Sequence, residues 1–199
     1  MNNFTSMGLR HQNGVLEILD QTLLPHEEVW HRIDLPDDMV LHIQRLAVRG
    51  APLIGVSAAV SLAHYAERHE DGIIPAWERL RAARPTAVNL MNCLDRQRRA
   101  FEDAGLSRQM LVEVAEKLFD EDVALCEAMA QRGSAFINDG DGILTHCNTG
   151  GLATVGIGTA LGVIRRAHEQ GKRIHVYVDE TRPLLQGARL TTWELEKLK

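Results

Sequence analysis

The last third of the sequence alternates between short apolar runs and stretches with helical periodicity, and this alternation constrains the fold more than any other feature. After the turn-forming segment 138–142 come the apolar run GILTHC, a Gly-rich turn, an apolar helix ending at Gly171, the run RIHVYV and a second helix. Parallel strands need a crossover of this kind, so the βαβα order predicts a Rossmann-like parallel sheet. Ligands of such sheets collect at the carboxyl ends of the strands, so we expect Cys147 and the pair Asp179-Glu180 to face one crevice.

The preceding residues predict a mainly helical region with a small sheet. Short alternating segments predict strands at 15–19 and 29–33, and Pro36 opens a helix whose apolar positions continue to Ala47. Further helices are expected to begin at Pro52, near Gly72, at the capping Thr86 and at Ser107.

The predicted fold class is therefore α/β. A mainly helical N-terminal domain with a small β-sheet is expected over residues 1–138, and the first βαβα part of a Rossmann-like domain over residues 139–199. Two strands cannot complete a parallel sheet of this type, because such strands normally have neighbours on their edges and helices on both faces. The second domain is thus expected to be truncated at Lys199.

Charge and composition exclude several classes of partner. A formal net charge of -5 gives no general attraction to nucleic acid or anionic lipid, and no apolar stretch reaches the roughly 20 residues of a membrane helix. The start MNNFTSMGLR lacks the features of a secretory signal, which predicts a cytoplasmic protein. Cys93, Cys126 and Cys147 lie far apart without a CxxC pair, which argues against a disulfide framework and a zinc cluster.

Two arginines stand where they could bind an anion. In RGAPLIG, Arg49 precedes a glycine and a helix that starts at Pro52, and free amides at a helix N-terminus attract anions. Arg84 lies between two predicted helices and can direct its planar guanidinium at a phosphate. The alternatives are an ordinary turn with a solvated arginine and an arginine that binds helix-terminal carbonyls.

A cysteine leaves a predicted strand just before a Gly-rich turn in THCNTGGLATVGIGTALG, which begins at Thr145. Cys147 there is a candidate catalytic thiol, because a helix N-terminus at a crevice favours the thiolate; a buried core cysteine is the alternative. Gly156 and Gly158 fall within the predicted helix and do not match the dinucleotide fingerprint, so we do not expect NAD. His146 points away from Cys147 along the strand, which favours a packing or hydrogen-bonding role.

Polar residues also follow the second predicted strand in DETRPLLQGARLTTWEL. Asp179 and Glu180 end the strand, and Gln186 with Gly187 stands near the start of the next helix. These groups either converge on the crevice or serve as helix caps and ion pairs.

Four segments in order, RGAPLIGVSAAV, RPTAVNL, THCNTGGLATVGIGTALGVI and DETRPLLQGARLTTWEL, resemble the signature stretches of the methylthioribose-1-phosphate isomerases. The resemblance runs from about Gly14 to Lys199. The wider family also contains ribose-1,5-bisphosphate isomerases and regulatory subunits of a eukaryotic translation-initiation guanine-nucleotide exchange factor. The resemblance implies a homodimeric isomerase of methionine salvage that converts 5-methylthioribose 1-phosphate to 5-methylthioribulose 1-phosphate without a metal or nucleotide cofactor.

The resemblance also implies roles for individual residues. Cys147 would be the catalytic thiol, and the substrate would be bound by Arg49, Gly50, Ala51, Arg84 and Gln186. Family enzymes use in addition an aspartate and an Asn-Lys pair on strands that follow the last residue of this chain, which implies that the chain alone is inactive. Ribose-1,5-bisphosphate isomerisation and a non-catalytic regulatory binding module remain the alternatives, and the sequence does not choose between proton and hydride transfer.

Overall fold

The computed structural model describes residues 1–198, and the chain begins with a small antiparallel sheet. Its four strands lie in sequence order: β1 (Phe4–Thr5), β2 (Leu9–Gln12), β3 (Val15–Leu19) and β4 (Trp30–Arg32). The turn between β2 and β3 is Asn13-Gly14, and both residues have positive φ, as a tight hairpin with the twist of its strands requires. Predicted strands 15–19 and 29–33 correspond to β3 and β4, whereas β1 and β2 were not predicted.

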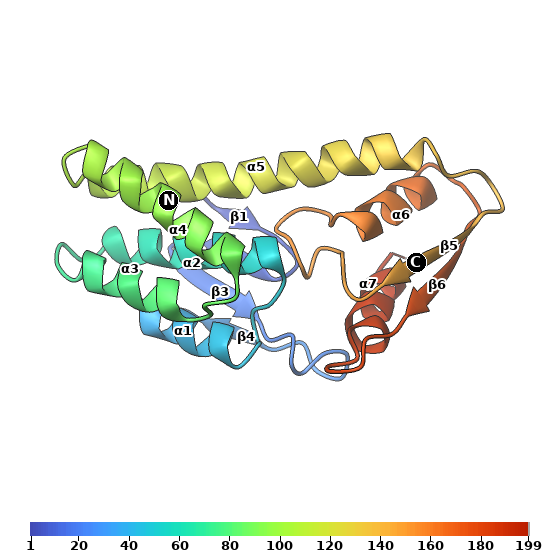
Figure 1. Ribbon diagram of the computed structural model, residues 1–199, viewed down its shortest axis with the longest axis horizontal. Helices are drawn as coiled ribbons and strands as arrows, with labels where there is room; N and C mark the ends of the chain where they lie inside the picture. Colours follow the sequence, from blue (N-terminus) through green and yellow to red (C-terminus); the bar gives the residue numbers. More distant parts are fainter. Residues whose placement is uncertain (199) are drawn as a thin grey trace.

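Five helices pack on this sheet and on one another (Figure 1). They are α1 (Pro36–Gln44), α2 (Ala51–Ala66), α3 (Ile73–Ala82), α4 (Val88–Asp103) and α5 (Arg108–Ser134). Helix α2 is apolar around most of its circumference because it is surrounded: it contacts α1, α3, α4 and α5. The long α5 runs along one side of the molecule and reaches α6 in the C-terminal part (Figure 1).

Two helix boundaries differ from the prediction. Helix α1 ends at Gln44 instead of continuing to Ala47, because Leu46 has a φ of +65° and turns the chain toward Arg49. Helix α4 begins at Val88 with Ala87 as its N-cap, so Thr86 does not cap it. Both changes lie where the backbone forms the turns that carry Arg49 and Arg84.

The C-terminal part contains the predicted βαβ unit. Strands β5 (Gly142–His146) and β6 (His175–Asp179) are parallel, with His146 opposite Asp179, and α6 (Ala160–Glu169) connects them. A π-helical turn, η1 (Gly187–Thr191), continues into α7 (Thr192–Glu196).

The helix predicted over Gly156 and Gly158 is wrong at its start. Residues 147–159 form a long loop, hereafter the glycine loop, and α6 begins only at Ala160. Gly158 has a φ of +96°, and a Cβ atom on it would lie 2.4 Å from the Cα of Gly150, with which it forms an isolated bridge. A helix cannot accommodate this close approach of two backbone segments.

The glycine loop packs directly on the helical part. A Cβ atom on Gly50 would lie 2.4 Å from the Cα of Ala153, and the amide of Leu53 donates to the carbonyl of Ala153 at 3.1 Å. The buried Gln21 side chain donates to the carbonyl of Leu152 at 2.8 Å. Contacts of this kind fix the end of β5 against the start of α2.

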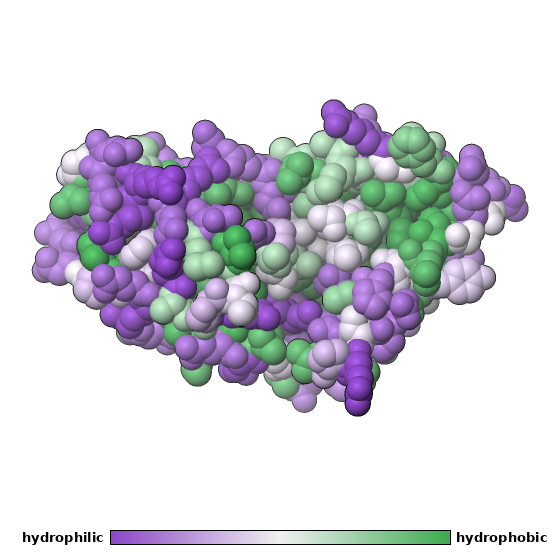
Figure 2. All heavy atoms as spheres, viewed as in Figure 1, coloured by the Kyte–Doolittle hydropathy of each residue, from purple (hydrophilic) through white to green (hydrophobic). Residues whose placement is uncertain are grey.

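Hydrophobic surface is distributed unevenly. Figure 2 shows mostly hydrophilic residues over α3 and α4 and a hydrophobic area over α6 and β5. On the parallel strands, Leu144 and Tyr177 are exposed, although parallel strands are normally covered on both faces. Among residues 1–198, no helix is both long and apolar enough to cross a membrane.

The space around two helical glycines predicts different effects on stability for the same Gly→Ala substitution. A Cβ atom on Gly55 in α2 would lie 2.8 Å from the carbonyl oxygen of Asn89, whereas one on Gly162 in α6 would have its nearest neighbour at 3.3 Å. Both alanines gain the same helix propensity, so the difference reports packing. We expect Gly55→Ala to lower the free energy of unfolding by about 1–3 kcal/mol, because α4 must move away from α2.

Gly162→Ala is the matched control and should change the free energy of unfolding by less than about 1 kcal/mol. Urea denaturation of both variants measures the difference. Equal stability of the two variants would contradict the close α2–α4 contact.

Candidate active site

A pocket of about 490 Å³ lies between the helical part and the C-terminal part. All five residues predicted to bind substrate line it together: Arg49, Gly50, Ala51, Arg84 and Gln186. Other lining residues are Leu46, Ile54, Thr86, Ala87, Pro183 and Leu184. Residues that are far apart in the sequence therefore form one cavity.

Arg49 links this pocket to Cys147. Burial lowers the pKa of Arg49 from its ordinary value, and the nearby Cys147 side chain opposes this effect. Arg189 and Arg84 lie close enough to lower the pKa of Arg49 further by repulsion. An anion bound near Arg49 would relieve this repulsion between like charges.

Two polar atoms at the pocket lack a protein partner. Among residues 1–198, no hydrogen-bond acceptor is found for the buried Nη1 of Arg49, and no donor for the buried Oε1 of Gln186. An unpaired buried polar group is costly, so such atoms are commonly satisfied by a ligand or an ordered water. The two atoms provide one donor and one acceptor for a polar ligand.

The start of α2 contributes less than the sequence suggested. Pro52 has no amide hydrogen, and the amide of Leu53 is already bonded to the carbonyl of Ala153. Within residues 1–198, the amide of Ala51 has no recorded backbone acceptor. The expected group of free helix-terminal amides is thus reduced, and the guanidinium groups carry most of the positive charge.

Cys147 occupies a strained position at the end of β5. Its φ is +63°, a left-handed conformation that β-carbon-bearing residues rarely adopt, and its side chain is half-buried. Thr191 holds the backbone there, because its hydroxyl donates to the carbonyl of Cys147 at 2.5 Å. The alternative of a fully buried core cysteine is wrong for Cys147 but describes Cys126, which is buried against the glycine loop.

Two carboxylates accept hydrogen bonds from backbone amides of the glycine loop. Glu194 accepts from the amides of Gly151 and Leu152, and Asp122 accepts from the amide of Val155. Burial raises the pKa of both carboxyls, while these hydrogen bonds oppose the rise. Our ground for not expecting NAD, that the glycines lie inside a helix, is wrong; the loop amides instead bind carboxylates of the protein itself.

The polar residues after β6 have structural partners. His146 pairs with Asp179 at 2.9 Å, as the hydrogen-bonding role predicted for it requires, and both side chains are exposed. The Glu180 carboxylate accepts from the amides of Gly187 and Ala188 and so caps η1. The capping alternative therefore describes Glu180, and Gln186 is the residue of this segment that enters the pocket.

Arg189 lies in the fourth motif segment and is a residue whose role the sequence does not predict. Its guanidinium donates to the carbonyls of Gln21, Thr22, Leu24 and Leu184. It thus fastens the segment after β3 to the turn before η1, and it adds positive charge near Arg49. No local pattern distinguishes this arginine, because three of its four acceptors lie more than 160 residues earlier in the chain.

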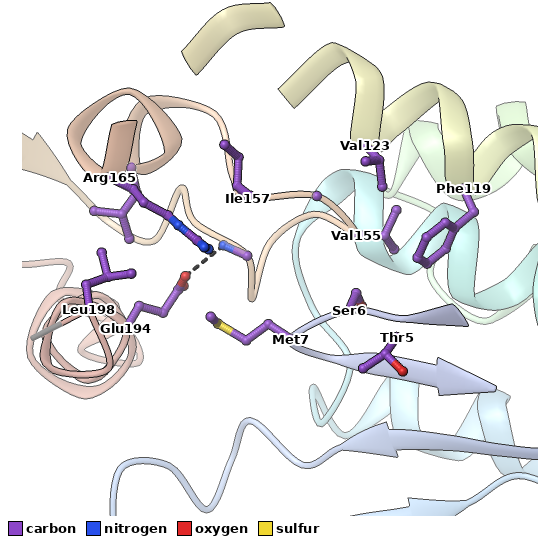
Figure 3. Close-up of a pocket in the computed structure, with 13 residues that line it drawn as sticks. Thr5, Ser6, Met7, Phe119, Val123, Val155, Ile157, Arg165, Glu194 and Leu198 are labelled. Carbon is purple, nitrogen blue, oxygen red and sulfur yellow. Dashed lines mark hydrogen bonds between the residues drawn. The ribbon is translucent and has the colours of Figure 1, made fainter. Parts of the chain in front are cut away.

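A second cavity, of about 440 Å³, is lined in part by the glycine loop and has a different character (Figure 3). Apolar side chains from α5 and the loop line much of it, including Phe119, Val123, Val155 and Ile157. None of the predicted site residues is among its lining residues. The first pocket is therefore the candidate active site.

Known proteins resemble the chain over its whole length. A methylthioribose-1-phosphate isomerase of Klebsiella pneumoniae (strain 342) is 52% identical over 200 residues, which cover 100% of this chain and 58% of that protein. An isomerase of the same name from Cronobacter sakazakii is also 52% identical, and 59% of it is covered. The chain spans less than two thirds of the length of these relatives.

Solved structures show the same fold. The 5-methylthioribose 1-phosphate isomerase of Pyrococcus horikoshii OT3 matches with a TM-score of 0.89 and 35% identity over 98% of this chain and 58% of that one. Subunit delta of the translation initiation factor eIF-2B from A. fulgidus matches with a TM-score of 0.83 and 39% identity, over 97% of this chain and 60% of that one. These matches confirm the predicted α/β fold and the resemblance of the four motif segments.

One family model also covers most of the chain. It is described as the initiation factor 2 subunit family and matches residues 47–199, a range that holds all four motif segments. The chain belongs to the initiation factor 2 subunit family.

Proposed function

We propose that the complete protein is an aldose-ketose isomerase that converts 5-methylthioribose 1-phosphate to 5-methylthioribulose 1-phosphate. The observation that carries the proposal is the pocket that Arg49, Arg84 and Gln186 line together, with Cys147 close to Arg49. The relatives that are 52% identical bear the name of this enzyme, which supports the same conclusion.

The first step is binding of the phosphate. The free Nη1 of Arg49 and the guanidinium of Arg84 can donate to phosphate oxygens, and charge-assisted hydrogen bonds of this type are among the strongest in proteins. The amide of Ala51 adds a donor at the start of α2. Gln186 offers its unpaired Oε1 to a sugar hydroxyl, so the substrate is held by both its phosphate and its sugar.

Cys147 acts next to the bound sugar. The substrate carries phosphate on carbon 1, so ring opening requires an acid at the ring oxygen, after which hydrogen moves from carbon 2 to carbon 1. In a proton-transfer route Cys147 is the base, and in a hydride route its thiol helps to shape and polarise a dry pocket. The electrons stay within the substrate in both routes, so no redox partner is required.

The lining of the pocket favours the methylthio substrate over ribose 1,5-bisphosphate. Among the described lining residues, Arg49 and Arg84 are the cations, which matches one phosphate. Leu46, Ile54 and Leu184 add apolar surface that suits a methylthio group and would leave a second phosphate poorly solvated. A bisphosphate would require further cations at that end.

A regulatory binding module is the second candidate function. The 39% identity to the eIF-2B subunit from A. fulgidus favours it, because that protein is a translation factor by name. The strained Cys147 close to Arg49 favours the enzyme, since a module that only binds has no need to hold a thiol in a left-handed conformation.

The remaining assignments follow from this function. We propose that the protein acts in methionine salvage, in the cytoplasm and as a homodimer. We also propose that residues 1–138 and 139–199 belong to separate domains, with the active site between them, because the pocket takes residues from both ranges.

Removing the thiol tests the catalytic role of Cys147. Cys147→Ala should lower kcat about 10²–10⁴-fold, the usual contribution of an acid-base group. The fold should be unchanged, because alanine keeps the same backbone demand at φ +63°. The assay is turnover of methylthioribose 1-phosphate by the complete protein.

Cys93→Ala is the matched control. Burial raises the pKa of Cys93 to about 11, and the residue lies against Gly55 outside the candidate pocket. It should keep its turnover. Near-normal kcat in Cys147→Ala would remove Cys147 from the mechanism.

Substrate selectivity tests the pocket. Arg84→Gln should weaken binding of methylthioribose 1-phosphate by about 10- to 100-fold, the loss expected for one charge-assisted hydrogen bond. The wild-type protein should bind this ligand more tightly than ribose 1,5-bisphosphate, and isothermal titration calorimetry measures both.

Arg98→Gln serves as the control, because this arginine pairs with Glu102 on the exposed face of α4. Preference for the bisphosphate would overturn the choice of substrate. Binding of the methylthio sugar without conversion by the complete protein would support the regulatory module.

A further inference from the structure

Glu194 is a buried carboxylate for which the proposed chemistry has no use. It lies on α7 with 3% of its surface exposed, and among residues 1–198 no arginine or lysine forms an ion pair with it. A buried carboxylate without an ion pair must be stabilised by hydrogen bonds. The donors of these hydrogen bonds therefore show which part of the chain Glu194 stabilises.

All of the hydrogen bonds recorded for Glu194 go to the glycine loop. Its carboxylate accepts from the amide of Gly151 at 2.7 Å, the bond drawn in Figure 3, and from the amide of Leu152 at 3.3 Å. It also accepts from the Asn148 side chain at 2.7 Å. Each of these donors lies within five residues of Cys147. The carboxylate therefore stabilises the conformation of the loop segment that directly follows the thiol.

Thr191, one turn earlier in the chain, holds the other side of the same point. Its hydroxyl donates to the carbonyl of Cys147 and accepts from Asn148 at 3.3 Å. Thr191 is completely buried, so its bond to the carbonyl is not shared with solvent. Together, Thr191 and Glu194 fix the backbone of Cys147 and the side chain of Asn148 by hydrogen bonds.

The space around Glu194 is shaped for it. A Cβ atom on Gly150 would lie 2.2 Å from a Glu194 carboxylate oxygen, so only glycine at position 150 leaves room for the carboxylate. The left-handed conformation of Cys147 costs energy and persists only where surrounding contacts impose it. Thr191 and Glu194 provide those contacts from one short helical segment, which also carries Gln186 at its start.

We propose that Glu194 and Thr191 are positioning residues that hold the Cys147 thiol in its place near Arg49, and that they act without touching the substrate. This inference rests on the proposed isomerase function for its kinetic readout, whereas its chemical readout does not depend on that function. Loss of either contact lets the loop relax and moves the thiol away from the guanidinium.

The kinetic test separates positioning from binding. In the complete protein, Glu194→Gln should lower kcat about 10²-fold, as expected for a small displacement of a reacting group. KM should stay within about twofold, because Arg49, Arg84 and Gln186 keep their places. Thr191→Val should act in the same direction, and Thr191→Ser, which keeps the hydroxyl, should restore turnover.

The chemical test measures the thiol itself. Iodoacetamide alkylates Cys147 with loss of iodide, and peptide mass spectrometry distinguishes this residue from Cys93 and Cys126. Release of the half-buried thiol should speed its alkylation about tenfold in Glu194→Gln and in Thr191→Val. Glu196→Gln, an exposed glutamate on the same helix, and Thr191→Ser should react like the wild type.

Circular dichroism first establishes that each variant is folded. A folded Glu194→Gln with wild-type kcat and alkylation rate would overturn the proposal, and Thr191→Val decides the matter if Glu194→Gln does not fold. If the wild-type protein does not turn over methylthioribose 1-phosphate, the proposed function fails, while the alkylation rates still test the positioning.

Discussion

The close approach of the Arg49 guanidinium to the Cys147 sulfur is the feature on which the candidate site depends. It joins the start of α2 to the end of β5, two points separated by almost one hundred residues of sequence. A guanidinium in this position is costly, because it is partly desolvated and two further arginines lie near it. The most economical explanation is that the pocket is built to receive an anion that completes the arrangement.

Several separate contacts preserve this geometry. Gly50 and Ala153 meet at a distance that excludes a side chain, Arg189 ties the segment after β3 to the turn before η1, and Glu194 holds the glycine loop. In many α/β proteins a Gly-rich loop binds phosphate through its own amides. Here, protein carboxylates accept hydrogen bonds from several of those amides, and the function proposed above assigns the loop to positioning a thiol and the arginines to the anion site.

The sequence predicts those parts of the fold that depend on local patterns. Strands β5 and β6, the connecting helix and the starts of α2 and α5 follow from periodicity and capping residues. The start of α6 differs from the prediction because the apolar residues around Gly156 and Gly158 continue the helical periodicity. The bridge between Gly158 and Gly150 is what prevents a helix there. Strands β1 and β2 are short, and pairing with β3 stabilises them more than their own composition does.

The sequence predicts the residues that line the pocket but not the residues that support them, because the supporting contacts are long-range. The resemblance of four motif segments brought out the residues that line the pocket, and the structure places all five proposed binding residues around one cavity. The partners of Glu194 lie about 43 residues earlier in the chain, and most of those of Arg189 lie more than 160 residues earlier. A lone glutamate or arginine in a helical segment gives no sign of such distant acceptors and donors, because these contacts exist only in the folded chain.

Protection of Cys147 by ligand is the most direct test of the central claim that its thiol faces an anion pocket. The measurement is the iodoacetamide reaction rate of Cys147 in the complete protein, with and without saturating methylthioribose 1-phosphate. The account predicts that bound ligand slows the reaction of Cys147 and leaves Cys93 unaffected. An unchanged Cys147 rate, at a ligand concentration where calorimetry demonstrates binding, would show that the thiol and the ligand occupy different places.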